Sequence, residues 1–213
     1  ASTVGGALSA TATTGNITQG SEVAVGTTST FTTSASNGTI TLDDEDNAFT
    51  GALTLTTYGS GGNATLDNGT TALIIAASDV RGDLTLESGH ASGITDADGE
   101  TVTVGGNLAA TTTANNGDID MGTLAVTGTI ALTTHADASN NTSHATIVNT
   151  RAVKLAASTV DGNLNVTATT GDISQTGALD IEGTTTLLTS ADAATIDLST
   201  TTNAFTEALL ITT

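Results

Sequence analysis

A run of four acidic residues, 43–46, is the sharpest candidate for chemistry in this chain. It follows the alternating triplet Ile40–Leu42, at a position that we interpret as the turn after a strand. Calcium takes about six to eight oxygen ligands, mostly from carboxylates and carbonyls, so such a turn offers several of them. The alternative, which we favour, is a solvated acidic turn, because the matching turn at 199–203 contains no acid. The candidate calcium ligands here are Asp43, Asp44 and Asp46.

A second acidic motif lies between 96 and 100. Its Asp-x-Asp-Gly pattern resembles the core of a calcium loop, in which glycine permits a tight turn. The remaining spacing of an EF-hand is missing, and the chain has no nonapeptide calcium repeat. The alternative is a plain insertion, 90–100, specific to one part of the chain. The candidate calcium ligands here are Asp96, Asp98 and Glu100.

Catalysis is not expected. The histidines His90, His135 and His144 lie in predicted turns, and without cysteine a structural zinc site is not favoured. The chain has neither a nucleophile elbow nor a phosphate-binding loop. Paired carboxylates hydrolyse glycosides, and some polysaccharide-cleaving enzymes are β-helices. Such sites use aromatic platforms, however, and this chain has one tyrosine and three phenylalanines. We therefore predict no enzyme and no cofactor, apart from calcium.

Threonine arrays suggest a further alternative, an ice-binding face. Thr-x-Thr triplets begin at Thr30, Thr39, Thr54 and Thr101, each around an apolar residue. The threonines would then point outward from a strand. An ice-binding face needs the triplet at one position in successive turns, which this irregular spacing does not establish.

The elements that must position these residues are short β-strands. Triplets such as Val23–Val25, Leu53–Leu55 and Leu84–Leu86 alternate apolar and polar residues, and Gly, Asn, Asp and Ser separate them. Threonine is β-branched and favours strands. No segment has an apolar helical stripe. The sequence predicts an all-β fold without helices.

A long internal repeat organises the strands. Residues 1–8 reappear as 157–164, and 47–57 reappear as 203–213, both at the same offset. A divergent copy lies between them. We read one continuous domain, 1–213, built from copies at 1–76, 77–156 and 157–213, the third shorter than the others.

A parallel β-helix fits this pattern best. Each turn of such a solenoid lays its strands on the preceding turn, around a narrow core of small side chains. Turns of about 20 to 25 residues, rising about 4.8 Å each, would give a rod of about 40 to 55 Å. β-Sandwich repeats are the alternative architecture.

Composition excludes several classes of function. The chain has 22 acidic and 3 basic residues, a formal net charge of -19. Nucleic acids and anionic membranes select basic patches, so neither is an expected partner. No apolar run approaches the roughly 18 to 20 residues that span a bilayer, so we expect no membrane insertion. Only 12% of residues are charged and aliphatic residues recur regularly, which favours order over disorder.

The segments Gly162–Gln175 and Gly177–Leu187 resemble the repeats of filamentous-haemagglutinin-like bacterial surface exoproteins and adhesins. The resemblance implies a right-handed β-helix, export to the cell surface, and a role in adhesion or filament formation. We accordingly expect a structural rod of an extracellular filament or adhesin stalk. An adhesive module that recognises a glycan or receptor through its loops is the alternative. The expected partners are flanking repeats of the same chain, or further subunits stacked end to end.

Overall fold

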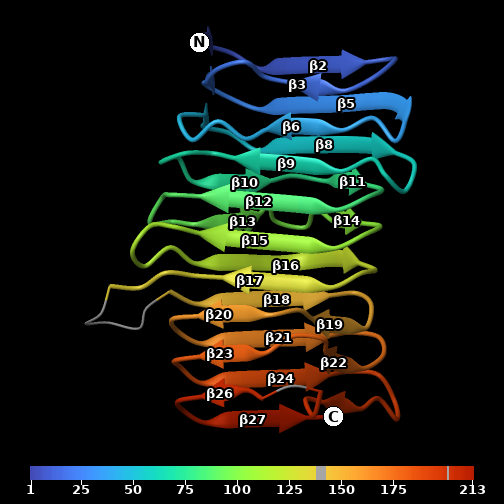
Figure 1. Cartoon of the computed structure of the whole chain (residues 1–213), viewed down its shortest axis with the longest axis vertical. Coiled ribbons are helices and arrows are strands. Elements are labelled where there is room, and N and C mark those ends of the chain that lie inside the picture. The colour runs from blue at the N-terminus through green and yellow to red at the C-terminus, as the bar shows by residue number, and fades with distance from the viewer. Residues whose placement is uncertain (138–142, 201) are drawn as a thin grey trace.

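The protein is an all-β solenoid in which parallel strands stack in about nine turns (Figure 1). The computed structural model describes residues 1–137, 143–200 and 202–213, and this part of the chain contains no helix. Nor, within those residues, is there any helical segment long and apolar enough to cross a membrane. The predicted parallel β-helix is confirmed, and the sandwich alternative is wrong because the strands pair in parallel with the next turn.

The strands pair along three faces of the rod. Face 1 consists of β1 (Ser2–Val4), β4 (Val23–Val25), β7 (Ala48–Phe49), β10 (Leu73–Ile75), β13 (Ile94–Asp96), the start of β16 (Ile119–Val126), β18 (Ala145–Asn149), β21 (Leu164–Ala168), β24 (Thr185–Thr189) and β27 (Leu209–Thr212). Face 2 consists of β2 (Leu8–Ala12), β5 (Ser29–Ser36), β8 (Leu53–Tyr58), β11 (Ser78–Val80), β14 (Val102–Val104), the end of β16, β19 (Val153–Leu155), β22 (Ile173–Gln175) and β25 (Ile196–Asp197). Face 3 consists of β3 (Ile17–Thr18), β6 (Ile40–Leu42), β9 (Ala64–Asp67), β12 (Leu84–Ser88), β15 (Leu108–Thr112), β17 (Ile130–Thr133), β20 (Ser158–Val160), β23 (Leu179–Ile181) and β26 (Ala204–Phe205).

Aliphatic side chains stack in register through the interior. On face 3, Ile40, Ala64, Leu84, Leu108 and Ile130 occupy one column, and all five are at most 1% exposed. Alternate residues in most strands point outward, which produces the observed alternation of buried and more exposed positions. Burying one such Leu or Ile stabilises the fold by about 1.5 to 3 kcal/mol. The narrow core explains why small aliphatic residues replace large aromatic ones.

Two buried asparagines close gaps between strands on successive turns. The Asn68 amide accepts from Phe49 N at 2.8 Å and donates to Phe49 O at 3.1 Å, linking β7 to the segment before β10. Asn149 does the same for Val126, at 2.8 and 3.1 Å. A side-chain amide carries the same donor and acceptor as a peptide group, so it continues the ladder where the backbone turns away.

Successive copies of the long repeat do not begin on the same face of the rod. Equivalent strands of the three copies are β1, β11 and β20, and they lie on faces 1, 2 and 3 in turn. The reason is that each complete copy supplies ten strand positions, counting β16 twice, on a three-faced rod. Each copy therefore advances three turns and one face.

The turns differ in length along the rod. The turn that joins the paired residues Ala145 and Leu164 is slightly shorter than the predicted range, and the turn that joins Ile119 and Ala145 is slightly longer. Strand pairing stays parallel through both of them. The loops between strands therefore absorb the variation in turn length.

Candidate functional site

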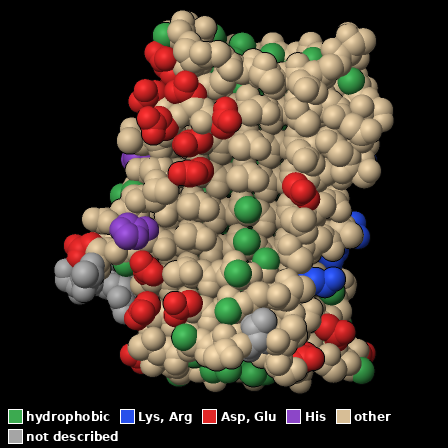
Figure 2. All heavy atoms as spheres, in the orientation of Figure 1, with side chains coloured by type: hydrophobic (Ala, Val, Ile, Leu, Met, Phe, Trp, Pro, Cys, Tyr) green, Lys and Arg blue, Asp and Glu red, His purple; other side chains and the backbone are tan. Residues whose placement is uncertain are grey.

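The predicted ligands Asp43, Asp44 and Asp46 lie in the turn between β6 and β7. Asp43 and Asp46 are exposed, and Asp44 is half-buried. Asp44 Oδ1 accepts a hydrogen bond from Asp46 N at 3.1 Å, which holds the turn together locally. This turn belongs to the acidic area at the edge of the N-terminal turns in Figure 2.

Neighbouring turns add two carboxylates, Asp67 and Glu87, that the motif at 43–46 does not indicate. Leu42 pairs with Leu66, so the residues that follow, Asp43 and Asp67, occupy matching positions on face 3. Asp67 pairs with Glu87 on the next turn. We call Asp43, Asp67 and Glu87 the acidic stack. The sequence held a signal for it, because each member follows the previous one by about one predicted turn.

Burial and neighbouring negative charge raise the pKa values of two members of the acidic stack, Asp67 and Glu87. Partial burial raises the pKa of Asp67 above its ordinary value, and the charges of Asp43 and Asp44 raise it further, against a hydrogen bond from Gly69 N that lowers it. Burial likewise raises the pKa of Glu87, with the charge of Asp67 as a second cause. Like charges one strand apart disfavour the ionised form.

A hollow of ≈ 210 Å³ opens beside the acidic stack. Its lining includes Glu45, Asp67, Gly69 and Glu87. Gly69 has a φ of +52°, and a Cβ there would collide with Glu45 O, so the close approach of these two turns requires glycine. Its N–H donates to Asp67 Oδ1 at 2.8 Å. The arrangement concentrates negative charge in a concave surface, which attracts mobile cations.

Asp96, Asp98 and Glu100 do not converge in the same way. Asp98 and Glu100 are exposed, whereas the Asp96 carboxylate accepts from Gly122 N at 2.9 Å and from Thr123 N at 2.7 Å. The Thr123 hydroxyl also donates to Asp96 Oδ2 at 2.6 Å. Asp96 thus fastens β13 to the next turn. The segment 90–100, interpreted as a loop insertion, contains β13 itself.

Across the described residues 1–137, 143–200 and 202–213, no group of three or more His, Asp or Glu side chains has a geometry that could hold a metal ion. The calcium sites stay predictions. The histidines have local roles: His90 Nδ1 accepts from Ser92 N and His144 Nδ1 from Asn163 N, both at 2.9 Å. His135 Nδ1 lies 3.8 Å from Asp161 Oδ2.

The Asp96–Thr123 contact is the middle copy's version of a corner found in the other two. In the first copy Gln19 and Asn47 exchange two side-chain hydrogen bonds, of 2.9 and 3.0 Å. In the third copy Gln175 and Asn203 exchange the same two bonds, both of 2.9 Å. We call these three contacts, Gln19–Asn47, Asp96–Thr123 and Gln175–Asn203, the corner pairs.

The partner in the middle copy is displaced by one position. The strand register makes Leu124 the equivalent of Asn47, and Leu124 is fully buried in the core. An aliphatic side chain cannot accept or donate, so the preceding residue, Thr123, makes the contact with Asp96 instead. The link across the turn is therefore kept although the residue that makes it has changed.

Two of the threonine triplets lie in register on face 2, beside a Ser-Ala-Thr segment of the preceding turn. Ser9, Thr30 and Thr54 are paired neighbours on face 2, and Thr11, Thr32 and Thr56 form the adjacent column. The next residue in the second column is Asp79. A charged side chain interrupts the threonine surface there, so the triplets beginning at Thr30 and Thr54 form a small array, and Thr101 lies outside it. The triplet that begins at Thr39 lies on face 3, where Thr41 pairs with Thr18 and Thr65.

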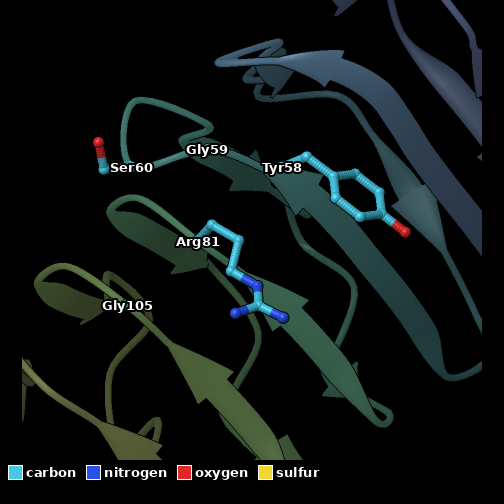
Figure 3. Close-up of a pocket in the computed structure, with 5 residues that line it drawn as sticks. All are labelled: Tyr58, Gly59, Ser60, Arg81 and Gly105. Atoms are coloured by element: carbon cyan, nitrogen blue, oxygen red, sulfur yellow. The ribbon is translucent and has the colours of Figure 1, made fainter.

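A second hollow, of ≈ 480 Å³, lies on the N-terminal half of face 2. Tyr58, Gly59, Ser60, Arg81 and Gly105 line it. Tyr58 is 49% exposed, and Arg81 Nη2 donates to Asp79 Oδ2 at 2.7 Å. In Figure 3 the phenol and the guanidinium project from successive turns, away from the Gly59–Ser60 turn. The single tyrosine of the chain and one of its three basic side chains thus share one open surface.

Comparison with known proteins identifies a family but no activity. A family model described as repeats of unknown function (DUF5649) matches residues 1–56, 61–121 and 140–212. No curated protein and no solved structure matches the chain.

Proposed function

The chain belongs to the DUF5649 family of repeats of unknown function, and on that premise we propose that it is a structural rod of an extracellular bacterial filament or adhesin stalk, without catalysis. The observation that carries the proposal is the stacking of about nine turns by parallel strand pairing, which is unbroken on face 3. On faces 1 and 2 the amides of Asn68 and Asn149 bridge the places where backbone pairing is interrupted. A stack of this kind transmits tension from turn to turn through the hydrogen bonds between neighbouring turns, because each turn contacts only its neighbours.

The surface charge supports the same role. A net charge of -19 on a rod of this size keeps parallel rods apart at low salt, since like charges repel within the Debye length. The acidic stack adds a surface at which divalent cations would reduce that repulsion. The resemblance of Gly162–Gln175 to exoprotein repeats supports an extracellular location for the rod.

Immunogold labelling of intact source cells tests the location. An antibody against the purified chain should label fibres on unpermeabilised cells, and brief external protease treatment should remove the label. Label that appears only after permeabilisation would contradict the proposal. A known cytoplasmic protein labelled in parallel serves as the control for cell integrity.

A second candidate, an adhesive module that binds a glycan, is favoured by the Tyr58–Arg81 surface. An exposed aromatic ring can stack on a sugar, and a neighbouring guanidinium can bind an acidic substituent of it. A glycan array tests this role with the wild-type chain, Tyr58→Ala, and Lys154→Ala as a matched exposed substitution on another turn. Signal lost in Tyr58→Ala and retained in Lys154→Ala would establish the surface. Equal signals in all three would eliminate it.

A further inference from the structure

The first internal junction between repeats has a characteristic set of hydrogen bonds. The opening strand of the second copy, β11, lies on the outer edge of β8, with Asp79 opposite Thr56. Leu55 N donates to Ser78 Oγ at 3.0 Å, and Arg81 N donates to Thr57 Oγ1 at 3.0 Å. The Ser78 hydroxyl in turn donates to Ala76 O at 2.9 Å. A serine hydroxyl thus replaces the missing backbone acceptor for Leu55.

The second internal junction repeats this arrangement on a different face. The opening strand of the third copy, β20, lies on β17 with Thr159 opposite Thr133. Leu132 N donates to Ser158 Oγ at 3.1 Å, and Asp161 N donates to Thr134 Oγ1 at 3.1 Å. The contacts therefore follow from the repeat sequence and do not depend on the position in the rod.

The strand β27 occupies the position in the repeat that β8 and β17 occupy. Ile211 is equivalent to Leu55 and Leu132, and Thr213 is equivalent to Thr57 and Thr134. Leu55 and Leu132 are both 0% exposed, whereas Ile211 is 50% exposed. Among the strands formed by the described residues, none pairs with the outer edge of β27. Within the described residues, the Ile211 side chain and N–H therefore lack the contacts that Leu55 and Leu132 make at the two internal junctions.

We propose that the outer edge of β27 binds the opening strand of a further repeat of the same family, entered through a full turn of the kind formed by residues 58–77. The inference rests on the proposed rod function and specifies its partner and register. Ile211 N donates to a serine hydroxyl equivalent to Ser78, and the residue opposite Thr212 is the equivalent of Asp79. Thr213 Oγ1 accepts the amide equivalent to that of Arg81.

The intervening turn is part of the required partner. At both internal junctions the chain first covers the other faces, through β9 and β10 or through β18 and β19, before the opening strand reaches its site. Ser2–Val4 of a second molecule has the serine at the right position but covers a single face. Docked alone on β27, it would leave β25 and β26 without partners, so simple stacking of two molecules is disfavoured.

Extension of the full chain tests the proposal. A copy of residues 58–83 is appended after Thr213, and amide hydrogen exchange is measured residue by residue. Exchange at Ile211 should slow by about 100-fold or more, toward the rates of Leu55 and Leu132 in the same molecule, because buried bonded amides exchange only through opening. Leu55 and Leu132 serve as internal references for complete protection.

A matched control removes a single hydroxyl group from the junction. Ser78→Ala, made only in the appended copy, removes the acceptor for Ile211 N and should speed its exchange by about 10-fold while other amides of β27 stay protected. Unchanged exchange at Ile211 in the intact extended chain would overturn the proposal. So would protection of Ile211 in the unextended chain that rises with protein concentration, since a second molecule would then suffice. Neither result depends on where the protein is located in the cell.

Discussion

The corner pairs of the outer copies and of the middle copy make the same hydrogen-bonded link across a turn, but with different chemical groups. Gln19–Asn47 and Gln175–Asn203 use two neutral amides, and Asp96–Thr123 uses a carboxylate, a hydroxyl and two backbone amides. The three pairs lie at the ends of strands of three different faces, β3, β22 and β13. What is retained is a hydrogen-bonded link across one turn, and the face on which it lies is irrelevant to it.

The two amide corner pairs differ in burial, because one lies in an interior turn and the other in the last described turn. Asn47 is 1% exposed and donates to Leu42 O and Asp67 O, while Asn203 is half-buried and donates to Leu198 O. Identical sequences therefore contribute unequally to stability, because burial determines the cost of leaving a polar group without its partner.

Removing Asn47, the most buried side chain of the corner pairs, should lower the stability of the protein more than any other substitution considered below. Asn47→Ala deprives Val23 N, Leu42 O and Asp67 O of their partner, and we expect a loss of about 3 kcal/mol in the free energy of unfolding. Urea denaturation measures the loss. Asn203→Ala is the matched control, with an expected loss of about 1 kcal/mol. Equal losses in the two variants would show that burial does not distinguish the outer copies.

The middle copy's corner pair should be somewhat less sensitive. Asp96→Ala leaves Gly122 N and Thr123 N without an acceptor in a half-buried position, with an expected cost of about 2 kcal/mol. Asp98→Ala, in the following exposed turn, should change stability by less than about 0.5 kcal/mol. Thermal unfolding with and without calcium is the measurement. A calcium-dependent rise in midpoint that both variants abolish would replace the structural role of Asp96 with a ligand role.

A double variant exchanges the carboxylate and hydroxyl of the middle copy for the two amides of the outer copies. The double variant Asp96→Gln, Thr123→Asn places a Gln–Asn amide pair across the same turn of the middle copy, and its stability should lie within about 1 kcal/mol of the wild type. Each single variant should cost more than the double one, because the two new amides compensate each other. A double-mutant cycle measures that coupling. If the stability losses of the two single variants simply added in the double variant, the new Gln and Asn amides would not be in contact, because Thr123 is displaced by one position from the site of Asn47.

Sequence periodicity was sufficient to predict the fold class and the long repeat. Alternating triplets bounded by turn residues imply strands, and the match between Ala1–Leu8 and Ala157–Leu164 implies copies of one unit. The rotation of each copy by one face was not predictable, because it depends on how many strands fill a repeat. The motif at 96–100 predicts a loop because it resembles a calcium site, whereas the alignment of Asp96 with Gln19 and Gln175 indicates a corner. The spacing of the acidic stack is compatible with one turn between members, but turn length varies along the rod, so only the strand register of the folded chain places the three carboxylates in one column.

The acidic turn 43–46 distinguishes the first copy from the third, and substitutions in the acidic stack beside it should change stability least. Asp43 of the acidic stack is equivalent to Ser199, whose side chain and N–H donate to Asp197 and lower its pKa. The raised pKa values of Asp67 and Glu87 mean that the folded state binds protons more tightly than the unfolded state. Their contribution is therefore fully present below the ordinary carboxylate pKa of about 4 and is lost as pH rises through the folded values.

Asp67→Asn should therefore stabilise the protein more at pH 7 than at acidic pH, as measured by urea denaturation across the range from about pH 4 to pH 7. Asp197→Asn provides the control of opposite sign. The lowered pKa of Asp197 contributes stability above its ordinary value, which is lost as pH falls through the folded value, so this substitution should destabilise at neutral pH. The difference between each variant and the wild type isolates one carboxylate from the other acids that titrate in the same range. A pH-independent difference for Asp67→Asn would mean that the acidic stack carries no electrostatic repulsion, and the first and third copies would then differ at this turn in sequence alone.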